Sequence, residues 1–211
     1  SDGFRLLFEL QAVDEQWRIT DLGRKLAKLP VDPRLGRMVL AAQAENCLQE
    51  ILIIVAALAI QDPRERPLEK QQAADEKHRR FRDENSDFIA LLNLWNYYHD
   101  QARQLSKNQL RNLCQAEFIS FVRMREWHDL HQELLGRVTE IGMRVNTEPA
   151  PYQNLHRALL TGLLGHLGFK QEENIYLGAR DRNFYLFPGS KKKKKRPRWV
   201  VAAELVETTR L

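Results

Sequence analysis

Residues 19–35 read Ile-Thr-Asp-Leu-Gly-Arg-Lys-Leu-Ala-Lys-Leu-Pro-Val-Asp-Pro-Arg-Leu, and they predict two helices in direct succession. Thr20 can accept a hydrogen bond from the free amides of a first helical turn, and Pro30 ends that helix. Asp32 is a strong cap for a second helix, and Pro33 has the backbone angle that the first helical position prefers. This stretch therefore fixes two helices and the sharp break between them.

The residues before this stretch predict a helix followed by a short hairpin. Phe4, Leu7 and Phe8 recur at helical spacing. From Val13 to Ile19 apolar and polar residues nearly alternate, as they do in a brief strand. The order helix, wing, helix, helix resembles the later part of a winged-helix domain, which we assign to residues 1–42.

Residues 43–146 predict a helical bundle. The run Ile51–Ile60 is apolar on every side, so its helix belongs at the centre of the bundle, and we expect Asn46 to cap it. Capping residues also mark helix starts at Ser86 and Ser106. A long helix is expected from about Glu117 to Ile141, closed by Gly142, with either Trp127 or His128 on its buried seam.

Residues 147–211 change in character. Pro149 and Pro151 mark a linker, and the apolar spacing predicts one more helix over Tyr152–Leu167. Three short apolar stretches follow, which predict a small antiparallel β-module with too few strands to close a barrel. The fold class expected for the whole chain is therefore mainly α, with a small β-domain after the bundle.

The composition sets the class of protein. The chain has 211 residues with 43% hydrophobic residues, which is ordinary for a folded protein. Its longest apolar run is too short to span a membrane, and no secretion signal precedes it, so we expect a soluble, cytoplasmic protein without a membrane partner. Cys47 and Cys114 lie in apolar helical surroundings, which favours two reduced thiols over a disulfide.

Charge is distributed unevenly. Residues 151–211 hold 12 Lys or Arg and 5 Asp or Glu, a net charge of +7, whereas residues 1–150 carry −2. Such asymmetry indicates a module that binds a polyanion, attached to a nearly neutral scaffold.

The sequence predicts no catalytic site of its own. It contains no Gly-x-x-x-x-Gly-Lys-Ser/Thr phosphate loop and no Ser, Cys or Thr in the context of an activated nucleophile, so ATP hydrolysis by this chain alone is not expected. His128 and His131 lie three residues apart on a helix, but no third ligand stands at a suitable spacing, and we favour a bundle helix over a metal site. No cofactor is predicted for the chain itself.

The basic residues of the β-module are the predicted nucleic-acid contacts, because Lys and Arg side chains gain affinity by displacing counterions from phosphates. The alternatives are a solvated charge run or a nuclear-import-like patch. Tyr176, Tyr185 and Trp199 are candidates for stacking on bases, whereas core packing is the favoured role of Phe184, Phe187 and Trp199. The predicted contacts are Lys170, Arg180, Arg182, Lys191, Lys192, Lys193, Lys194, Lys195, Arg196 and Arg198.

The bundle offers a second, weaker set of cations. Its members are Arg79, Arg80, Arg82, Arg123 and Arg125, and Arg123 is counted among the predicted RNA contacts. For this set as a whole we favour ion pairs on a solvated face.

These motifs together resemble the DEAH-box RNA helicases. Residues 19–35 are similar to the family signature "LTxLGRxLAxLPLDPRL" of its winged helix. The resemblance continues through His78-x-x-Phe81 and through residues 86–95 and 118–127 of the helicase-associated bundle, and it ends in residues 187–190 and 199–209, which look like the family's OB-fold. The Arg-Met-Arg-Glu-Trp form of residues 123–127 is most similar to the bacterial HrpA-type subgroup.

The resemblance implies the C-terminal region of an ATP-dependent helicase that moves 3′ to 5′ along single-stranded RNA. It implies a bundle that acts as a ratchet and a truncated OB-fold over residues 147–211. The partners it implies are single-stranded RNA, the motor domains of the same protein and a regulatory protein. ATP and Mg²⁺ are expected only for the intact helicase. The chain departs from the family at Glu117, where many relatives have Asn, and after Ser190, where Lys begins at once.

A different class of function stays open from the residues alone. In this alternative the chain is an interaction module whose basic loop docks an acidic protein partner. Salt dependence of RNA binding, and its tolerance of base sequence, distinguish the two.

Overall fold

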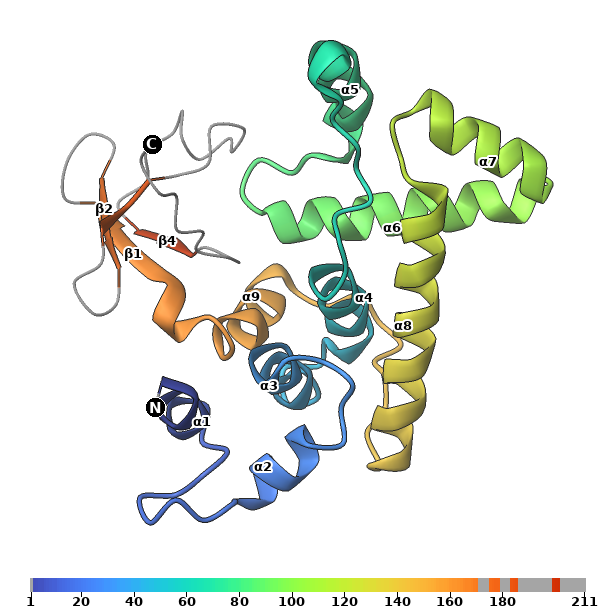
Figure 1. Cartoon of the computed structure of the whole chain (residues 1–211). Helices are drawn as coiled ribbons and strands as arrows, with labels where there is room; N and C mark the ends of the chain where they lie inside the picture. The colour runs from blue at the N-terminus through green and yellow to red at the C-terminus, as the bar shows by residue number, and fades with distance from the viewer. Residues whose placement is uncertain (1, 171–174, 179–182, 186–198, 202–211) are drawn as a thin grey trace.

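The computed structural model describes residues 2–170, 175–178, 183–185 and 199–201, and the described part is mainly helical (Figure 1). Short 3₁₀ helices lie at η1 (Leu68–Lys70), η2 (Arg79–Phe81) and η3 (Leu164–His166). The α-helices are α1 (Asp2–Glu9), α2 (Asp21–Leu26), α3 (Pro33–Ala42), α4 (Leu48–Leu58), α5 (Gln71–His78), α6 (Asp87–Gln104), α7 (Lys107–Ala116), α8 (Phe121–Glu140) and α9 (Tyr152–Leu160).

The first three helices form as the sequence predicts. The Thr20 side chain accepts a hydrogen bond from the backbone amide of Gly23 at 3.0 Å, which caps α2. Asp32 caps α3 by accepting from the amide of Arg34 at 2.9 Å. The expected wing is reduced to one antiparallel bridge between Val13 and Ile19.

Helix α4 lies at the centre of the helical part, where it contacts α3, α6, α8 and α9 (Figure 1). Its residues from Ile51 to Ala57 are all buried, as expected of a helix that is apolar on every side. The expected cap is wrong, because α4 begins at Leu48 and Asn46 adopts a left-handed backbone with φ of 52° in the preceding turn. The cap position falls to Cys47, whose side chain makes no capping bond.

The long helix predicted from about Glu117 begins four residues later than expected. Ser106 and Gln109 form the expected capping box at α7, but α7 ends at Ala116 and α8 begins only at Phe121. Trp127 is fully buried, which decides the seam of α8 in its favour over His128. Gly142, with φ of +87°, closes the C-terminal end of α8 as predicted.

The last predicted helix is shorter than expected. Helix α9 ends at Leu160, and the chain passes through η3 into a strand that begins at Leu167. Gly162 lies where this change occurs, and a side chain there would stand 2.2 Å from the Arg34 carbonyl oxygen. The two backbones therefore approach so closely that this position requires glycine.

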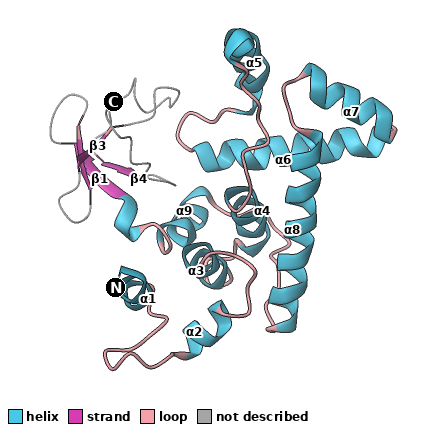
Figure 2. Cartoon of the chain, viewed as in Figure 1, coloured by secondary structure: helices cyan, strands magenta, loops and turns pink. Residues whose placement is uncertain are grey.

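Four short strands make one antiparallel sheet in the order β3-β2-β1-β4. Figure 2 shows the strands together, beyond the end of α9. The strands are β1 (Leu167–Lys170), β2 (Tyr176–Gly178), β3 (Asn183–Phe184) and β4 (Trp199–Val201). One more strand is therefore described than the sequence predicts, because only Leu167 of β1 falls within the predicted helix and no strand is predicted over residues 168–170. Among the described residues, no helix is long and apolar enough to cross a membrane.

Candidate nucleic-acid interface

Most of the predicted RNA contacts lie outside the described residues. Those contacts are Arg180, Arg182, Lys191, Lys192, Lys193, Lys194, Lys195, Arg196 and Arg198. The structure places the other two, Lys170 at the end of β1 and Arg123 in the first turn of α8, on separate elements.

Lys170 lies opposite Tyr176 in the register of β1 and β2. Tyr176 is only 1% exposed, so its ring packs inside the module and cannot stack on a base from solvent. Tyr185, which follows β3, is 63% exposed and keeps the surface position that stacking requires. The two tyrosines therefore differ in exposure, although the sequence treats them alike.

Arg123 lies where the start of α8 meets the segment that follows α4. Its backbone amide donates to the capping hydroxyl of Ser120 at 3.3 Å, and its Nη1 donates to the carbonyl oxygen of Asp62 at 3.1 Å. Neither Arg123 nor Arg125 forms an ion pair within the described part of the chain. The expected intrahelical ion pairs of this segment are thus not observed.

Arg80 and Glu117 form the centre of a polar network at the turn between α7 and α8. The guanidinium of Arg80 pairs with the Glu117 carboxylate and lies over the rings of Phe81 and Tyr97, 4.7 and 4.2 Å from their centroids. The hydroxyl of Tyr97 donates to the same carboxylate oxygen at 2.8 Å. Glu117 is 7% exposed, so its carboxylate orients Arg80 from inside the protein and is not itself at the surface.

His78 anchors the same turn to α5. Its Nε2 lies 3.0 Å from the carbonyl oxygens of both Glu117 and Phe118, which makes this nitrogen the donor. Burial lowers the pKa of His78, so the imidazole is neutral. The Phe118 carbonyl also accepts from the Glu65 amide at 2.8 Å, and Phe118 itself has φ of 55°. These bonds hold the turn and explain why α7 and α8 are separate helices.

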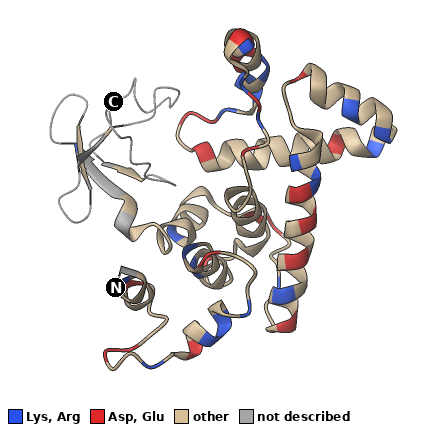
Figure 3. Cartoon of the chain, viewed as in Figure 1, with Lys and Arg blue, Asp and Glu red and all other residues tan. Residues whose placement is uncertain are grey.

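Arg80 and Arg82 are the members of the second set of cations that form ion pairs within the described residues. Arg66 forms a two-pronged pair with Asp75 at 2.9 and 2.8 Å, and Arg82 lies 3.8 Å from the same carboxylate. Arg64 pairs with Asp62. Basic and acidic residues are accordingly interspersed over the bundle (Figure 3). Within the described residues, Arg79, Arg123 and Arg125 are the predicted bundle cations that have no carboxylate partner.

Three histidines gather around Trp95, and the sequence analysis identified only two of them. His99 Nε2 lies 3.1 Å from His128 Nδ1, and the Trp95 ring contacts His99 and His131 at centroid distances of 4.0 and 4.8 Å. Burial is the main cause that lowers the pKa of His131 to about 4. The four-residue spacing of Trp95 and His99 on one helix is the signal that could have revealed the third histidine.

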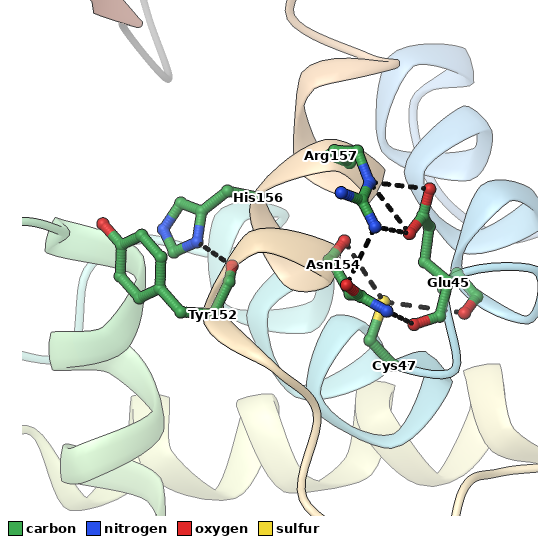
Figure 4. Close-up of polar contacts among 7 residues, drawn as sticks. Glu45, Cys47, Tyr152, Asn154, His156 and Arg157 are labelled. Atoms are coloured by element: carbon green, nitrogen blue, oxygen red, sulfur yellow. Dashed lines mark hydrogen bonds and ion pairs between the residues drawn. The ribbon is translucent and has the colours of Figure 1, made fainter.

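Helix α9 joins the first helices to the bundle through polar contacts (Figure 4). Arg157 donates hydrogen bonds from Nε and Nη2 to the Glu45 carboxylate at 2.9 to 3.1 Å. Asn154 Nδ2 donates to the Glu45 carbonyl oxygen at 3.0 Å. Burial raises the pKa of the nearby Cys47 thiol to about 12. The same cause raises the pKa of Cys114 to about 11. Both thiols stay protonated and do not provide a nucleophile.

The described residues therefore offer cations and aromatic surfaces for binding rather than groups for covalent chemistry. Among them, no cluster of three or more His, Cys, Asp or Glu side chains is arranged to hold a metal ion. Within the described part of the chain, the predicted cations that form no ion pair are Lys170, Arg79, Arg123 and Arg125.

Comparison with known proteins identifies related sequences. Residues 4–31 match the winged-helix model of the helicase associated domain (HA2), and residues 32–91 match its ratchet-like model. The whole chain is 55% identical over 216 residues to the ATP-dependent RNA helicase HrpA of Escherichia coli, and 52% identical over 218 residues to the HrpA homolog of Haemophilus influenzae. The chain spans 17% of the length of each of these relatives.

Proposed function

The chain belongs to the helicase-associated HA2 region of the HrpA-type DEAH-box helicases, and on this premise we propose that it binds and guides single-stranded RNA beside the motor domains of the same protein. The supporting observation is identity above 50% over the whole chain to two proteins that are named RNA helicases. The charge of the chain agrees with this role, because the net +7 of residues 151–211 suits a phosphate backbone.

Different parts of the chain have different proposed roles. We assign residues 1–42 to the winged-helix part, residues 43–146 to the ratchet-like bundle and residues 147–211 to an OB-fold, and the four-stranded sheet lies within the last of these ranges. RNA contacts are assigned to the β-module and to Arg123. We also propose the cytoplasm as the compartment, in keeping with two buried free thiols.

Nucleotide chemistry is assigned to the longer helicase and not to these residues. The sequence has no phosphate loop, and within the described residues no carboxylate or histidine cluster fits Mg²⁺. The names of the two relatives give no support for a regulatory protein as a partner.

Fluorescence anisotropy of a labelled oligouridylate, titrated with the chain at several salt concentrations, tests the RNA assignment. If roughly three to six phosphates are engaged, the logarithm of the affinity falls against the logarithm of salt with a slope of about −2 to −4, at about −0.7 per phosphate. Absence of binding at low salt would contradict the proposal for the chain on its own.

A matched pair of variants locates the contact. One replaces the five lysines Lys191–Lys195 by Gln, and the other replaces the five exposed lysines of the helical part by Gln, so both lose the same charge. The first should reduce the slope by as much as about 3.5, and the second by much less. The control lysines are Lys25, Lys28, Lys70, Lys77 and Lys107.

The charge asymmetry also favours a second candidate, a module that docks an acidic protein. A labelled polyglutamate peptide in the same titration serves as its probe. Equal affinity for polyglutamate and oligouridylate would favour this alternative, whereas preference for the oligonucleotide supports RNA.

A further inference from the structure

An open groove of about 870 Å³ runs along α8, and the RNA proposal does not use it. One wall is the outer stripe of α8, and the other is formed by α7 and by the segment after α4. Figure 1 shows α7 and α8 meeting at the end of α8 that begins the groove. Because the stripe runs from Phe121 to Glu133, twelve residues further along the helix, the groove is about 18 Å long.

The floor of this groove is apolar and partly open to solvent. It includes Ile60, Phe121, Val122 and Leu130. Val122 is 73% exposed although it is a branched hydrocarbon side chain, and the other three are only partly buried. Contiguous apolar side chains that are rimmed by polar residues mark interaction surfaces more often than isolated exposed ones do.

The rim is acidic toward the C-terminal end of α8. Glu126, Asp129 and Glu133 follow one another at helical spacing and are all exposed. Within the described residues none of the three forms an ion pair or a hydrogen bond through its carboxylate, whereas Glu140 on the same helix pairs with Arg137. Three carboxylates beside an apolar floor are therefore available for a cationic partner.

The two cations of the groove lie toward its other end. Arg111 of α7 covers the Phe121 ring at 5.4 Å, and Arg125 stands one turn after Phe121 on α8. Charge along the groove is thus mixed near α7, where Glu65 also lines it, and wholly acidic toward Glu133. A partner helix with its own cations at one end would match this order in only one direction.

We propose that this groove docks a basic amphipathic helix of about three turns, which is the length of helix that spans 18 Å. Apolar side chains of the partner would cover Val122 and Leu130, and its Lys or Arg residues would face Glu126, Asp129 and Glu133. The acidic rim repels RNA phosphates and anionic lipids, so a polypeptide is the partner that the charges favour. The groove therefore adds a protein-docking face to a chain whose basic face is proposed for RNA.

The probe for this proposal is a labelled helical peptide of Leu and Lys, with the Leu residues on one face, and its matched peptide has Glu in place of Lys. Anisotropy titrations with the whole chain should show binding of the Lys peptide and not of the Glu peptide. The double variant E126K/E133K should weaken binding of the Lys peptide by about tenfold or more, and Val122→Ser should also weaken this binding.

The control double variant E69K/E76K makes the same change of charge on η1 and α5, outside the groove, and should change the affinity less than about twofold. All replaced side chains are exposed, and circular dichroism confirms that each variant folds. The proposal is overturned if the Lys peptide does not bind or if both double variants weaken its binding equally.

Discussion

Trp127 of α8 donates a hydrogen bond from its indole Nε1 to the carbonyl oxygen of Ile53, in the middle of α4, at 2.8 Å. Trp127 is fully buried and Ile53 is 7% exposed, so water does not compete for either group. The indole also packs on Trp95 of α6, with ring centroids 5.1 Å apart. One side chain thus fixes the positions of three helices, and a buried donor left without this acceptor would cost about 1–3 kcal/mol.

Replacing Trp127 should therefore be among the most destabilising changes in the bundle. Trp127→Phe removes the donor and part of the ring and should lower the free energy of unfolding by about 1–3 kcal/mol, whereas Trp127→Ala should lower it by about 3–5 kcal/mol. Urea denaturation measures both. Trp17→Phe, at a position that is 56% exposed, is the control and should change the free energy by less than about 0.5 kcal/mol.

Glu117 should contribute to stability through Arg80. Glu117→Gln keeps an oxygen for the Tyr97 hydroxyl but removes the charge that faces the guanidinium, so we expect a loss of roughly 1–2 kcal/mol, a range that allows for the partial exposure of Arg80. Urea denaturation at neutral pH tests this. Glu76→Gln, at an exposed site on α5, should be neutral, and equal effects of the two substitutions would contradict the prediction.

Local chemistry predicts most helix starts and the central helix, because a cap or an all-apolar face depends on neighbouring residues alone. Thr20, Asp32, Ser86 and Ser106 each accept the expected backbone hydrogen bond. The position of the break between α7 and α8 is predicted only approximately, because the expected start at Glu117 lies four residues before Phe121. It depends on bonds from the turn to residues in the segment after α4, which are distant in sequence.

The candidate site is less predictable for the same reason. Charge counting identifies the basic residues, but it cannot tell which of them are neutralised. Arg80 is paired with a carboxylate 37 residues away, whereas Arg123 contacts a backbone carbonyl. Likewise, alternation in the β-module does not show that Tyr176 is buried and Tyr185 exposed. Tertiary contacts decide both questions.

The histidine cluster predicts a loss of stability in mild acid. Burial first, and then the neighbouring His128 and His99, lower the pKa of His131 from 6.5 to about 4. The folded protein therefore binds fewer protons than the unfolded chain, so the stabilisation is complete above about pH 6.5 and is lost as the pH falls toward 4. At about pH 5 the linkage relation gives a loss of about 2 kcal/mol.

The substitution His131→Phe isolates this effect, because the ring against Trp95 is kept and the titrating group is removed. Urea denaturation of both proteins at about pH 7 and pH 5 should show the unmodified chain losing about 2 kcal/mol more than the variant. Burial also lowers the pKa values of His78 and His99, so part of the acid sensitivity should persist in the variant. Identical pH dependence in the two proteins would rule out His131 as a contributor.

Two glycines of the α8 region should respond oppositely to the same substitution. Gly136 lies inside α8 with no atom within 4 Å of an added Cβ, so Gly136→Ala should raise the free energy of unfolding by about 0.5–1 kcal/mol. Gly142 has φ of +87°, a backbone that a side chain disfavours, so Gly142→Ala should lower it by about 1 kcal/mol even though space is open there. Thermal unfolding of the two variants tests the pair directly, because the substitutions are chemically identical and differ only in backbone conformation. Stabilisation by both would show that the end of α8 does not require the left-handed residue.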